Sequence, residues 1–270
     1  MFEVLVLSLI QGLTEFLPVS SSGHLILLPS LIGWQDHSLE IDGILHLGTL
    51  CSVVCYFFSE IKQMVVGFLL YYLKIGPKEG RSSHSAYAKL GMTLIVATLP
   101  VVIIGFVLKR VGLDVVRSPS INALMLSMGG MALYGADRIS TSHRSLLDMT
   151  FTRAFAIGLL QSVSLVPGSS RSGMCLTAAR FLGFDRVSAT QYAFLLSIPA
   201  ILGAFTLIFF DAYHDGIQMS YSTLGAYFCL SFLFGLGAIH FMLKFVQHKN
   251  SFFIFMIYRI VLGGAIFLLM

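Results

Sequence analysis

Long apolar stretches alternate with short polar segments along the whole chain. A helix needs about 20 apolar residues to cross the hydrocarbon core of a bilayer, and six stretches reach or approach this length. The pattern therefore predicts six transmembrane helices, at 43–61, 90–108, 121–137, 189–210, 223–243 and 252–270. A shorter apolar stretch, 63–73, predicts a helix that lies at the membrane interface.

Two further hydrophobic regions, 2–30 and 154–183, are interrupted near their middle by Pro, Gly and Ser. Non-helical backbone at membrane depth is tolerated only where it is buried in protein or lines a cavity. Both regions are therefore predicted to be re-entrant helical hairpins, which return to the side from which they enter. The whole pattern predicts an all-α integral membrane protein, with six transmembrane helices and two hairpins in one polytopic domain, 1–270.

The composition agrees with this membrane class. Hydrophobic residues make up 56% of the chain and charged residues only 11%, whereas soluble domains carry about 25% charged residues. The formal net charge of +4 suits basic cytoplasmic loops, and we expect no nucleic-acid partner. All four cysteines fall in apolar stretches and are expected to be buried thiols rather than metal ligands.

Basic residues orient the predicted helices, because cytoplasmic loops are enriched in Lys and Arg. With loop 31–42 placed outside, alternation puts twelve basic residues in inside loops and three in outside loops, all three in 109–120. The remaining two, Arg171 and Arg259, lie within hydrophobic regions. An intramembrane Arg is a functional-site hypothesis by default. Arg259, near the start of the last predicted span, is expected to extend toward the cytoplasmic interface.

The two interrupted regions resemble each other. Residues 11–23 read QGLTEFLPVSSSG and residues 161–173 read QSVSLVPGSSRSG, so that an offset of 150 aligns Gly23 with Gly173 and Ser21 with Arg171. Three predicted spans separate the hairpins, which therefore enter from opposite faces. This predicts an inverted-topology repeat, with repeat one at about 1–110 and repeat two at about 154–270. In transporters of this kind the broken helices meet near the midplane and form the ligand site.

The polar residues of the breaks suggest phosphoryl transfer on a lipid. Arg171 offers a rigid donor fork that suits phosphate oxygens, and a helix starting after Gly173 would point its positive end at the same anion. Ser21 and His24 are close enough in sequence for a serine activated by an imidazole. The alternatives are a structural role for His24 and close helix packing for the serines. The histidines that the sequence leaves as structural are His46 and His240.

The segments 15–24 and 167–173 resemble the two signature motifs of the undecaprenyl-diphosphate phosphatase family, also known as the bacitracin resistance proteins. The resemblance continues through 151–161, 194–200 and 257–268, and it covers essentially the whole chain. It implies hydrolysis of undecaprenyl diphosphate to undecaprenyl phosphate and inorganic phosphate, which recycles the lipid carrier for peptidoglycan synthesis and gives bacitracin resistance. It further implies a multi-pass protein of the bacterial inner membrane whose site opens to the periplasm. A homodimer is left open.

The resemblance also implies roles for individual residues and a divalent cation, Mg²⁺ or Ca²⁺, with Glu15 as the ligand. The implied catalytic residues are Glu15, Ser21, His24 and Arg171. The implied substrate-binding residues are Gln11, Ser20, Ser170, Arg171, Ser172 and Gly173. Two positions depart from the family pattern: Cys175 stands where the family has threonine, and Gln11 leaves one carboxylate for a cation.

Two rival functions can be compared with the sequence. The segment SSGH at 21–24 resembles a motif of the membrane-bound acid phosphatase superfamily, but that superfamily needs a histidine six residues after the arginine. Thr177 stands there, so this alternative is excluded. A lipid-phosphate transporter remains, because inverted repeats with midplane sites are a transporter architecture. Phosphate release by purified protein in detergent would separate an enzyme from a transporter.

Overall fold

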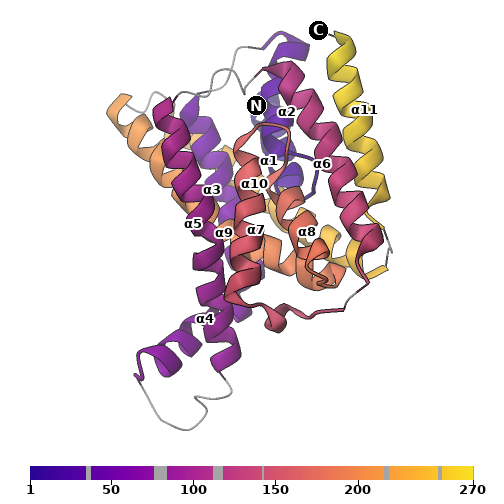
Figure 1. The fold of residues 1–270 in the computed structure, drawn as a ribbon. Coiled ribbons are helices and arrows are strands. Elements are labelled where there is room, and N and C mark those ends of the chain that lie inside the picture. The colour runs from indigo at the N-terminus through magenta and orange to yellow at the C-terminus, as the bar shows by residue number, and fades with distance from the viewer. Residues whose placement is uncertain are drawn as a thin grey trace.

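A computed structural model describes residues 1–34, 38–75, 84–111, 118–141, 143–215, 219–248 and 251–269, and these residues form helices and connecting loops without a strand (Figure 1). The α-helices are α1 (Phe2–Thr14), α2 (Ser21–Ile32), α3 (Leu39–Tyr56), α4 (Phe58–Gly67), α5 (Ser85–Val111), α6 (Pro119–Ile139), α7 (Phe151–Gln161), α8 (Arg171–Phe181), α9 (Arg186–Asp215), α10 (Tyr221–His248) and α11 (Phe253–Leu269). A π-helical turn, Phe68–Tyr72, and two 3₁₀ turns, Leu146–Asp148 and Ser162–Leu165, complete the described elements.

Four of these helices, α3, α5, α9 and α10, are long and apolar enough to cross a membrane. They coincide with four of the six predicted spans. The other two predicted spans, 121–137 and 252–270, are helical as well, in α6 and in the shorter α11 of 17 residues. The predicted interfacial helix, 63–73, begins earlier than expected, since α4 starts at Phe58 and passes into the π-helical turn.

Both hydrophobic regions with polar interruptions break where the sequence predicts. Ser20 and Ser170 have positive φ angles, 74° and 71°, which are uncommon for residues other than glycine. Each serine caps the helix that follows: Gly23 N donates to Ser20 Oγ at 3.3 Å, and Gly173 N donates to Ser170 Oγ at 3.1 Å. The same backbone turn and the same cap thus occur twice, 150 residues apart.

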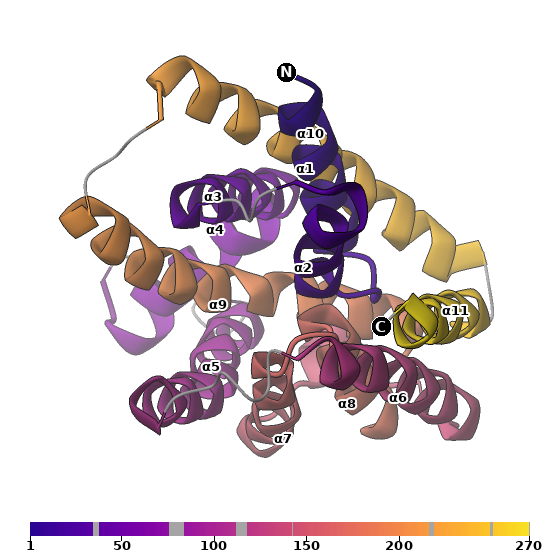
Figure 2. The same cartoon turned by 90° about the horizontal axis from the view of Figure 1, so that it is seen from above.

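The two hairpins open toward opposite ends of the molecule. In Figure 1, α1 and α2 open toward the top of the view, whereas α7 and α8 open toward the bottom. Seen from above, α1 lies beside α10 and α7 beside α5 (Figure 2). Small residues permit these close contacts: a Cβ on Gly12 would lie 2.5 Å from Phe234 Cβ, and one on Gly158 would collide with the Ala97 carbonyl. Close packing through small residues is typical of helices in membranes.

A buried ionic cluster joins the second hairpin to its neighbours. The carboxylate of Asp137, at the end of α6, accepts a hydrogen bond from Arg180 Nε of α8 at 2.9 Å. The same carboxylate accepts bonds from Arg186 of α9 at 2.8 and 3.1 Å, and the backbone N–H of Phe252 approaches it at 3.4 Å. Two arginines therefore share one carboxylate that is sealed from solvent, and this fixes the positions of α8 and α9 relative to α6.

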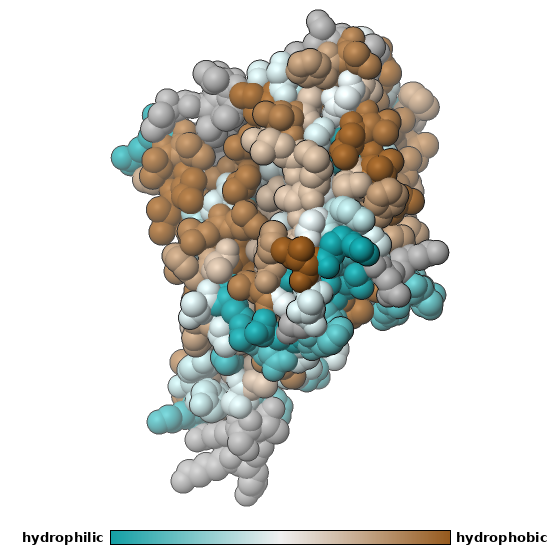
Figure 3. All heavy atoms as spheres, turned by 45° about the vertical axis from the view of Figure 1, so that its right-hand side comes forward, coloured by the Kyte–Doolittle hydropathy of each residue, from teal (hydrophilic) through white to brown (hydrophobic). Residues whose placement is uncertain are grey.

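Most of the surface in Figure 3 is hydrophobic, and the hydrophilic residues of this face gather toward its lower end. A wide apolar band of this kind is expected for a protein that is surrounded by lipid. The cysteine expectation was largely wrong. Cys175 is buried, but Cys51 is partly exposed, and Cys55 and Cys229 are exposed on the helix surfaces, where an apolar stretch faces outward instead of into the core.

Candidate active site

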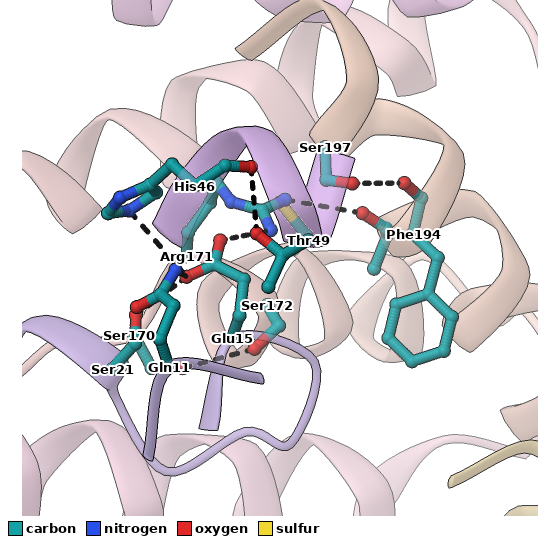
Figure 4. A network of polar contacts seen from close by, with 12 residues as sticks. Gln11, Glu15, Ser21, His46, Thr49, Ser170, Arg171, Ser172, Phe194 and Ser197 are labelled. Atoms are coloured by element: carbon teal, nitrogen blue, oxygen red, sulfur yellow. Dashed lines mark hydrogen bonds and ion pairs between the residues drawn. The ribbon is translucent and has the colours of Figure 1, made fainter. Parts of the chain in front are cut away.

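The carboxylate of Glu15 is the point where the two breaks meet (Figure 4). Glu15 follows α1 directly and is only 6% exposed. Its Oε1 accepts a hydrogen bond from the Arg171 guanidinium at 2.9 Å. Its Oε2 accepts bonds from Ser21 Oγ at 2.7 Å and from Gln11 Nε2 at 3.2 Å. Four predicted site residues are therefore brought together around one buried charge.

The local structure explains this convergence. Gln11 and Glu15 lie four residues apart and so share one face of α1. Pro18 cannot continue a helix, and the positive φ of Ser20 turns the chain so that α2 starts at Ser21. Arg171 occupies the equivalent first position of α8. The helix after each break therefore presents its first residue to the same carboxylate. This residue is Ser21 in α2 and Arg171 in α8.

Further hydrogen bonds fasten the two breaks to each other and to α9. Ser172 Oγ donates to the Leu17 carbonyl at 3.1 Å, which links the second break to the first. Arg171 Nη1 reaches the Ala193 carbonyl of α9 at 3.5 Å. The rings of Phe16 and Phe194 pack edge to face, with centroids 5.4 Å apart, directly beside this contact. The site is thus supported by apolar packing on one side and by backbone carbonyls on the other.

Arg259 of α11 holds the turns of both breaks. Its side chain is fully buried. It donates to the Pro18 carbonyl of the first break at 3.2 Å, and to the Gly168 and Ser169 carbonyls of the second at 3.0 and 2.8 Å. Its remaining bonds go to the carbonyls of Met125 and Leu126 on α6. The expectation that Arg259 extends to the interface was therefore wrong, because five backbone acceptors hold it inside the protein.

His24 does not contact Ser21 in the structure. Its Nδ1 donates to the Ser20 carbonyl at 2.7 Å, and its Nε2 lies 2.6 Å from the Tyr258 hydroxyl of α11. The two rings are stacked, with centroids 5.7 Å apart and an interplanar angle of 9°. Both ring nitrogens are therefore engaged, Nδ1 by Ser20 of the first break and Nε2 by Tyr258 of α11. Proton transfer between Ser21 and His24 remains a prediction, and it would require the imidazole to leave Tyr258.

A different histidine, His46, faces the carboxylate. Its Nε2 lies 4.0 Å from Glu15 Oε2, and its Nδ1 donates to the Asp42 carbonyl one turn earlier in α3 at 2.8 Å. The sequence interpretation left His46 as structural. The signal that could have identified it is an ionisable group within a predicted span, which is a functional-site hypothesis by default.

The remaining predicted substrate-binding residues shape the turns. The hydroxyls of Ser20 and Ser170 are occupied as helix caps, and Ser172 is 1% exposed. Gly173 is buried, and its N–H is the one that Ser170 caps. What the site offers to a ligand is therefore the partly exposed side chains, those of Ser21 and Arg171, together with the positive starts of α2 and α8.

Cys175 lies one turn after Arg171 in α8. It is fully buried, and its thiol donates to Gln161 Oε1 at 3.4 Å. Thr177 bonds within its own helix, to the Gly173 carbonyl at 2.7 Å. The departure from the family threonine thus places a weak thiol donor inside the second hairpin, where Gln161 accepts its hydrogen bond.

The residues fit a divalent cation only in part. Gln11 Oε1 is buried without a hydrogen-bond partner and belongs to the same side chain that contacts Glu15. An amide oxygen and a carboxylate are ligands that Mg²⁺ and Ca²⁺ accept, and Mg²⁺ often completes its shell with waters and substrate phosphates. Within the described ranges, no group of three His, Cys, Asp or Glu side chains could hold a metal on its own. The residues therefore suit a cation that is shared with a bound substrate.

An apolar helical bundle in which two broken helices bring a carboxylate, a serine and an arginine into contact is the arrangement of a membrane-embedded phosphohydrolase. The sequence pattern of the family described as bacitracin resistance protein BacA matches residues 4–265. The chain belongs to this family. It is similar to a protein named undecaprenyl-diphosphatase in Jannaschia sp. (strain CCS1), with 40% identity over 268 residues, 97% of this chain and 96% of the relative. A protein of the same name in Roseobacter denitrificans is 38% identical over 264 residues, with the same coverage.

Proposed function

We propose that this protein hydrolyses undecaprenyl diphosphate to undecaprenyl phosphate and inorganic phosphate, and thereby recycles the lipid carrier for cell-wall synthesis. The observation that carries the proposal is the contact of Ser21 and Arg171 with the Glu15 carboxylate, made by two breaks inside an apolar bundle. An Arg fork binds phosphate oxygens in a bidentate manner. The apolar surface around the bundle lets a prenyl chain remain in the lipid while its diphosphate enters the break.

The geometry favours Ser21 as the nucleophile. Its hydroxyl already donates to Glu15 Oε2 at 2.7 Å, within the range expected for a nucleophile and its base. As Ser21 Oγ bonds to the terminal phosphorus, its proton passes to Glu15. The bond from that phosphorus to the bridging oxygen breaks, and the electron pair leaves with undecaprenyl phosphate. Water then attacks the phosphoserine and supplies the proton that restores the Ser21 hydroxyl, and inorganic phosphate leaves.

Arg171 and the helix starts have the electrostatic role in this scheme. The terminal phosphoryl oxygens gain charge as the bond to the leaving group breaks, and preorganised donors stabilise this charge. A Mg²⁺ or Ca²⁺ ion would be held by Glu15 and Gln11 Oε1 together with the diphosphate, and it would neutralise part of the substrate's charge. Phosphate release measured with and without a chelator tests this cation.

We place six helices across the membrane, namely the four long apolar helices together with α6 and α11, and treat α1–α2 and α7–α8 as re-entrant hairpins. His46 lies seven residues after the start of α3, about 10 Å at 1.5 Å per residue. The positive-inside rule puts the start of α3 on the outer side of a bacterial inner membrane. The site then opens toward the periplasm, where used carrier lipid is released.

Phosphate release by the purified protein in detergent is the test of the proposed function. Undecaprenyl diphosphate should yield inorganic phosphate at a rate that is proportional to the protein concentration. A detergent micelle has no two sides, so a transporter of lipid phosphates would bind the substrate and release no phosphate. Binding without hydrolysis would therefore favour the transporter and refute the phosphatase.

A further inference from the structure

We propose that His46 is a catalytic residue of the phosphatase reaction, the histidine that carries the proton released by Ser21. The proposal rests on the proposed function. His46 Nε2 lies 4.0 Å from Glu15 Oε2, and this is the same oxygen that accepts the Ser21 hydroxyl at 2.7 Å. The His46 side chain is 26% exposed and that of Glu15 only 6%. Ser21, Glu15 and His46 thus form a series of three side chains along which a proton can move, and the imidazole is more accessible than the carboxylate.

The hydrogen bond made by Nδ1 determines the tautomer of His46. Its Nδ1 lies 2.8 Å from the Asp42 carbonyl, an oxygen that can only accept, so Nδ1 carries a hydrogen. In the neutral imidazole Nε2 is then the acceptor and is directed at Glu15. The Thr49 hydroxyl donates to the His46 carbonyl at 2.9 Å and helps to fix this turn of α3. The ring is thus held ready to take up a proton.

The two breaks differ at these positions although they share their backbone geometry. The offset of 150 that aligns Ser20 with Ser170 also aligns Glu15 with Leu165 and His46 with Leu196. The second break makes the same turn and the same cap with leucine at both positions, and Leu196 is fully buried. The fold of a break therefore needs neither Glu15 nor His46. Their joint presence at the first break, Glu15 within it and His46 facing it from α3, indicates chemistry rather than architecture.

Glu15 and Arg171 are the charged groups that the structure places on the Nε2 side of His46. Glu15 Oε2 lies 4.0 Å from Nε2, and Arg171 of α8 pairs with the other oxygen of the same carboxylate. On the Nδ1 side, the backbone carbonyl of Asp42 accepts the ring hydrogen.

The proton can be followed through the reaction. Ser21 gives it to Glu15 as the new bond to phosphorus forms, and Glu15 passes it to Nε2 of neutral His46. Glu15 is then an anion again and keeps its bond to Arg171. The bridging oxygen of the departing undecaprenyl phosphate takes up the proton from the imidazolium, so no charge accumulates in the site. In the second half-reaction the attacking water supplies the proton that restores Ser21.

The test compares His46→Gln with His240→Gln, with phosphate release as the readout. In His46→Gln, kcat should fall by roughly 10²-fold or more with little change in KM, because general acid–base catalysis typically contributes this much. His240 is an exposed residue of α10 that contacts Tyr56, so His240→Gln should keep the wild-type rate.

A second variant separates chemistry from structure. The access to His46 should allow imidazole added to the buffer to restore part of the activity of His46→Ala. A wild-type kcat in His46→Gln would overturn the proposal, and so would complete inactivity of His46→Ala that added imidazole does not rescue. Failure of the wild-type protein to release phosphate would instead refute the proposed function. The two failures are therefore distinguishable.

Discussion

Arg171 and Glu15 lie 156 residues apart in the chain and form an ion pair of 2.9 Å, with both side chains largely buried. Each residue stands at a point where a helix is broken, one in each hairpin. Removing one partner of a buried pair leaves an uncompensated charge and is strongly destabilising. The pair therefore holds the two hairpins together, and it also keeps an Arg fork at the place where a diphosphate would bind.

Arg171→Lys separates the charge of the residue from its shape. Lysine can still pair with Glu15, so the variant should fold and insert, but it lacks the planar fork that matches phosphate oxygens. We expect most of the phosphate-release activity to be lost while the melting temperature in detergent stays close to wild type. The matched control is Arg153→Lys, since Arg153 is partly exposed near the start of α7 and bonds to the Asp148 carbonyl, away from Glu15 in the chain. Near-normal turnover of Arg171→Lys would contradict its assignment to the diphosphate.

Ser21→Ala tests the route of attack. If Ser21 is the nucleophile, the variant should bind substrate without turnover, and the wild-type protein should yield a phosphoserine at position 21 on rapid quenching. Ser22→Ala is the control, because the neighbouring hydroxyl is exposed and contacts Ser20 at 3.3 Å rather than Glu15. A measurable rate in Ser21→Ala, with no phosphoenzyme trapped in the wild type, would show that water attacks directly.

Arg259→Met is expected to destabilise the protein severely. The substitution removes all five hydrogen bonds of the guanidinium. The Met125 and Leu126 carbonyls keep their bonds within α6, but the Pro18, Gly168 and Ser169 carbonyls of the breaks lose their donor. An unsatisfied buried acceptor costs about 1–3 kcal/mol, so a total loss of about 3 kcal/mol or more is expected even after relaxation. Thermal unfolding in detergent measures this loss. Arg138→Met, at the exposed end of α6, should have little effect, and equal melting temperatures for the two variants would exclude the bracing role of Arg259.

Gly168→Ala should disrupt the second break. Gly168 has a φ of 89°, a conformation that costs an alanine energy, and an added Cβ would collide with the Asn122 carbonyl. We expect lower stability and reduced phosphate release. Gly237→Ala is the control, because its Cβ would meet nothing within 4 Å in α10, where alanine is favoured over glycine by up to about 1 kcal/mol. An unchanged Gly168→Ala variant would show that the turn can relax without cost.

The orientation can be tested with single cysteines in a background that lacks the four native ones. Ser220 directly precedes α10, His248 is its last residue, and both are exposed. A helix of this length spans the bilayer, so the two positions should report opposite sides. Ser220→Cys should react with an impermeant thiol reagent in intact cells, and His248→Cys only after the membrane is opened. The reverse pattern would place the site on the cytoplasmic side.

The sequence predicted the positions of the helices well, because helix formation in lipid depends on local properties. Apolar length decides which segments can span the membrane, and Pro, Gly and Ser mark where a helix must stop. The breaks near Pro18 and Gly168 followed from these rules. So did the likeness of the two breaks, which the shared φ angles of Ser20 and Ser170 make visible in three dimensions.

The same local reasoning was wrong about Arg259, and it paired Ser21 with a histidine that the structure does not bring to it. Short separation along the chain favoured Ser21 with His24, but Tyr258 of α11 engages the imidazole of His24. His46, 31 residues after Glu15, faces the carboxylate instead. Which side chains meet across helices depends on helix rotation and close packing, and a single sequence does not specify these.

The sequence by itself determined that this is a helical membrane protein with two polar breaks, because hydrophobic length and helix-breaking residues act within one segment. It also determined the family, because the two motifs are long and occur together. Only the tertiary structure decided that Arg259 braces both breaks and that His46 lies at the Glu15 carboxylate. These contacts join α3 and α11 to turns far away in the chain, and they exist only once the hairpins have packed from opposite ends into the bundle.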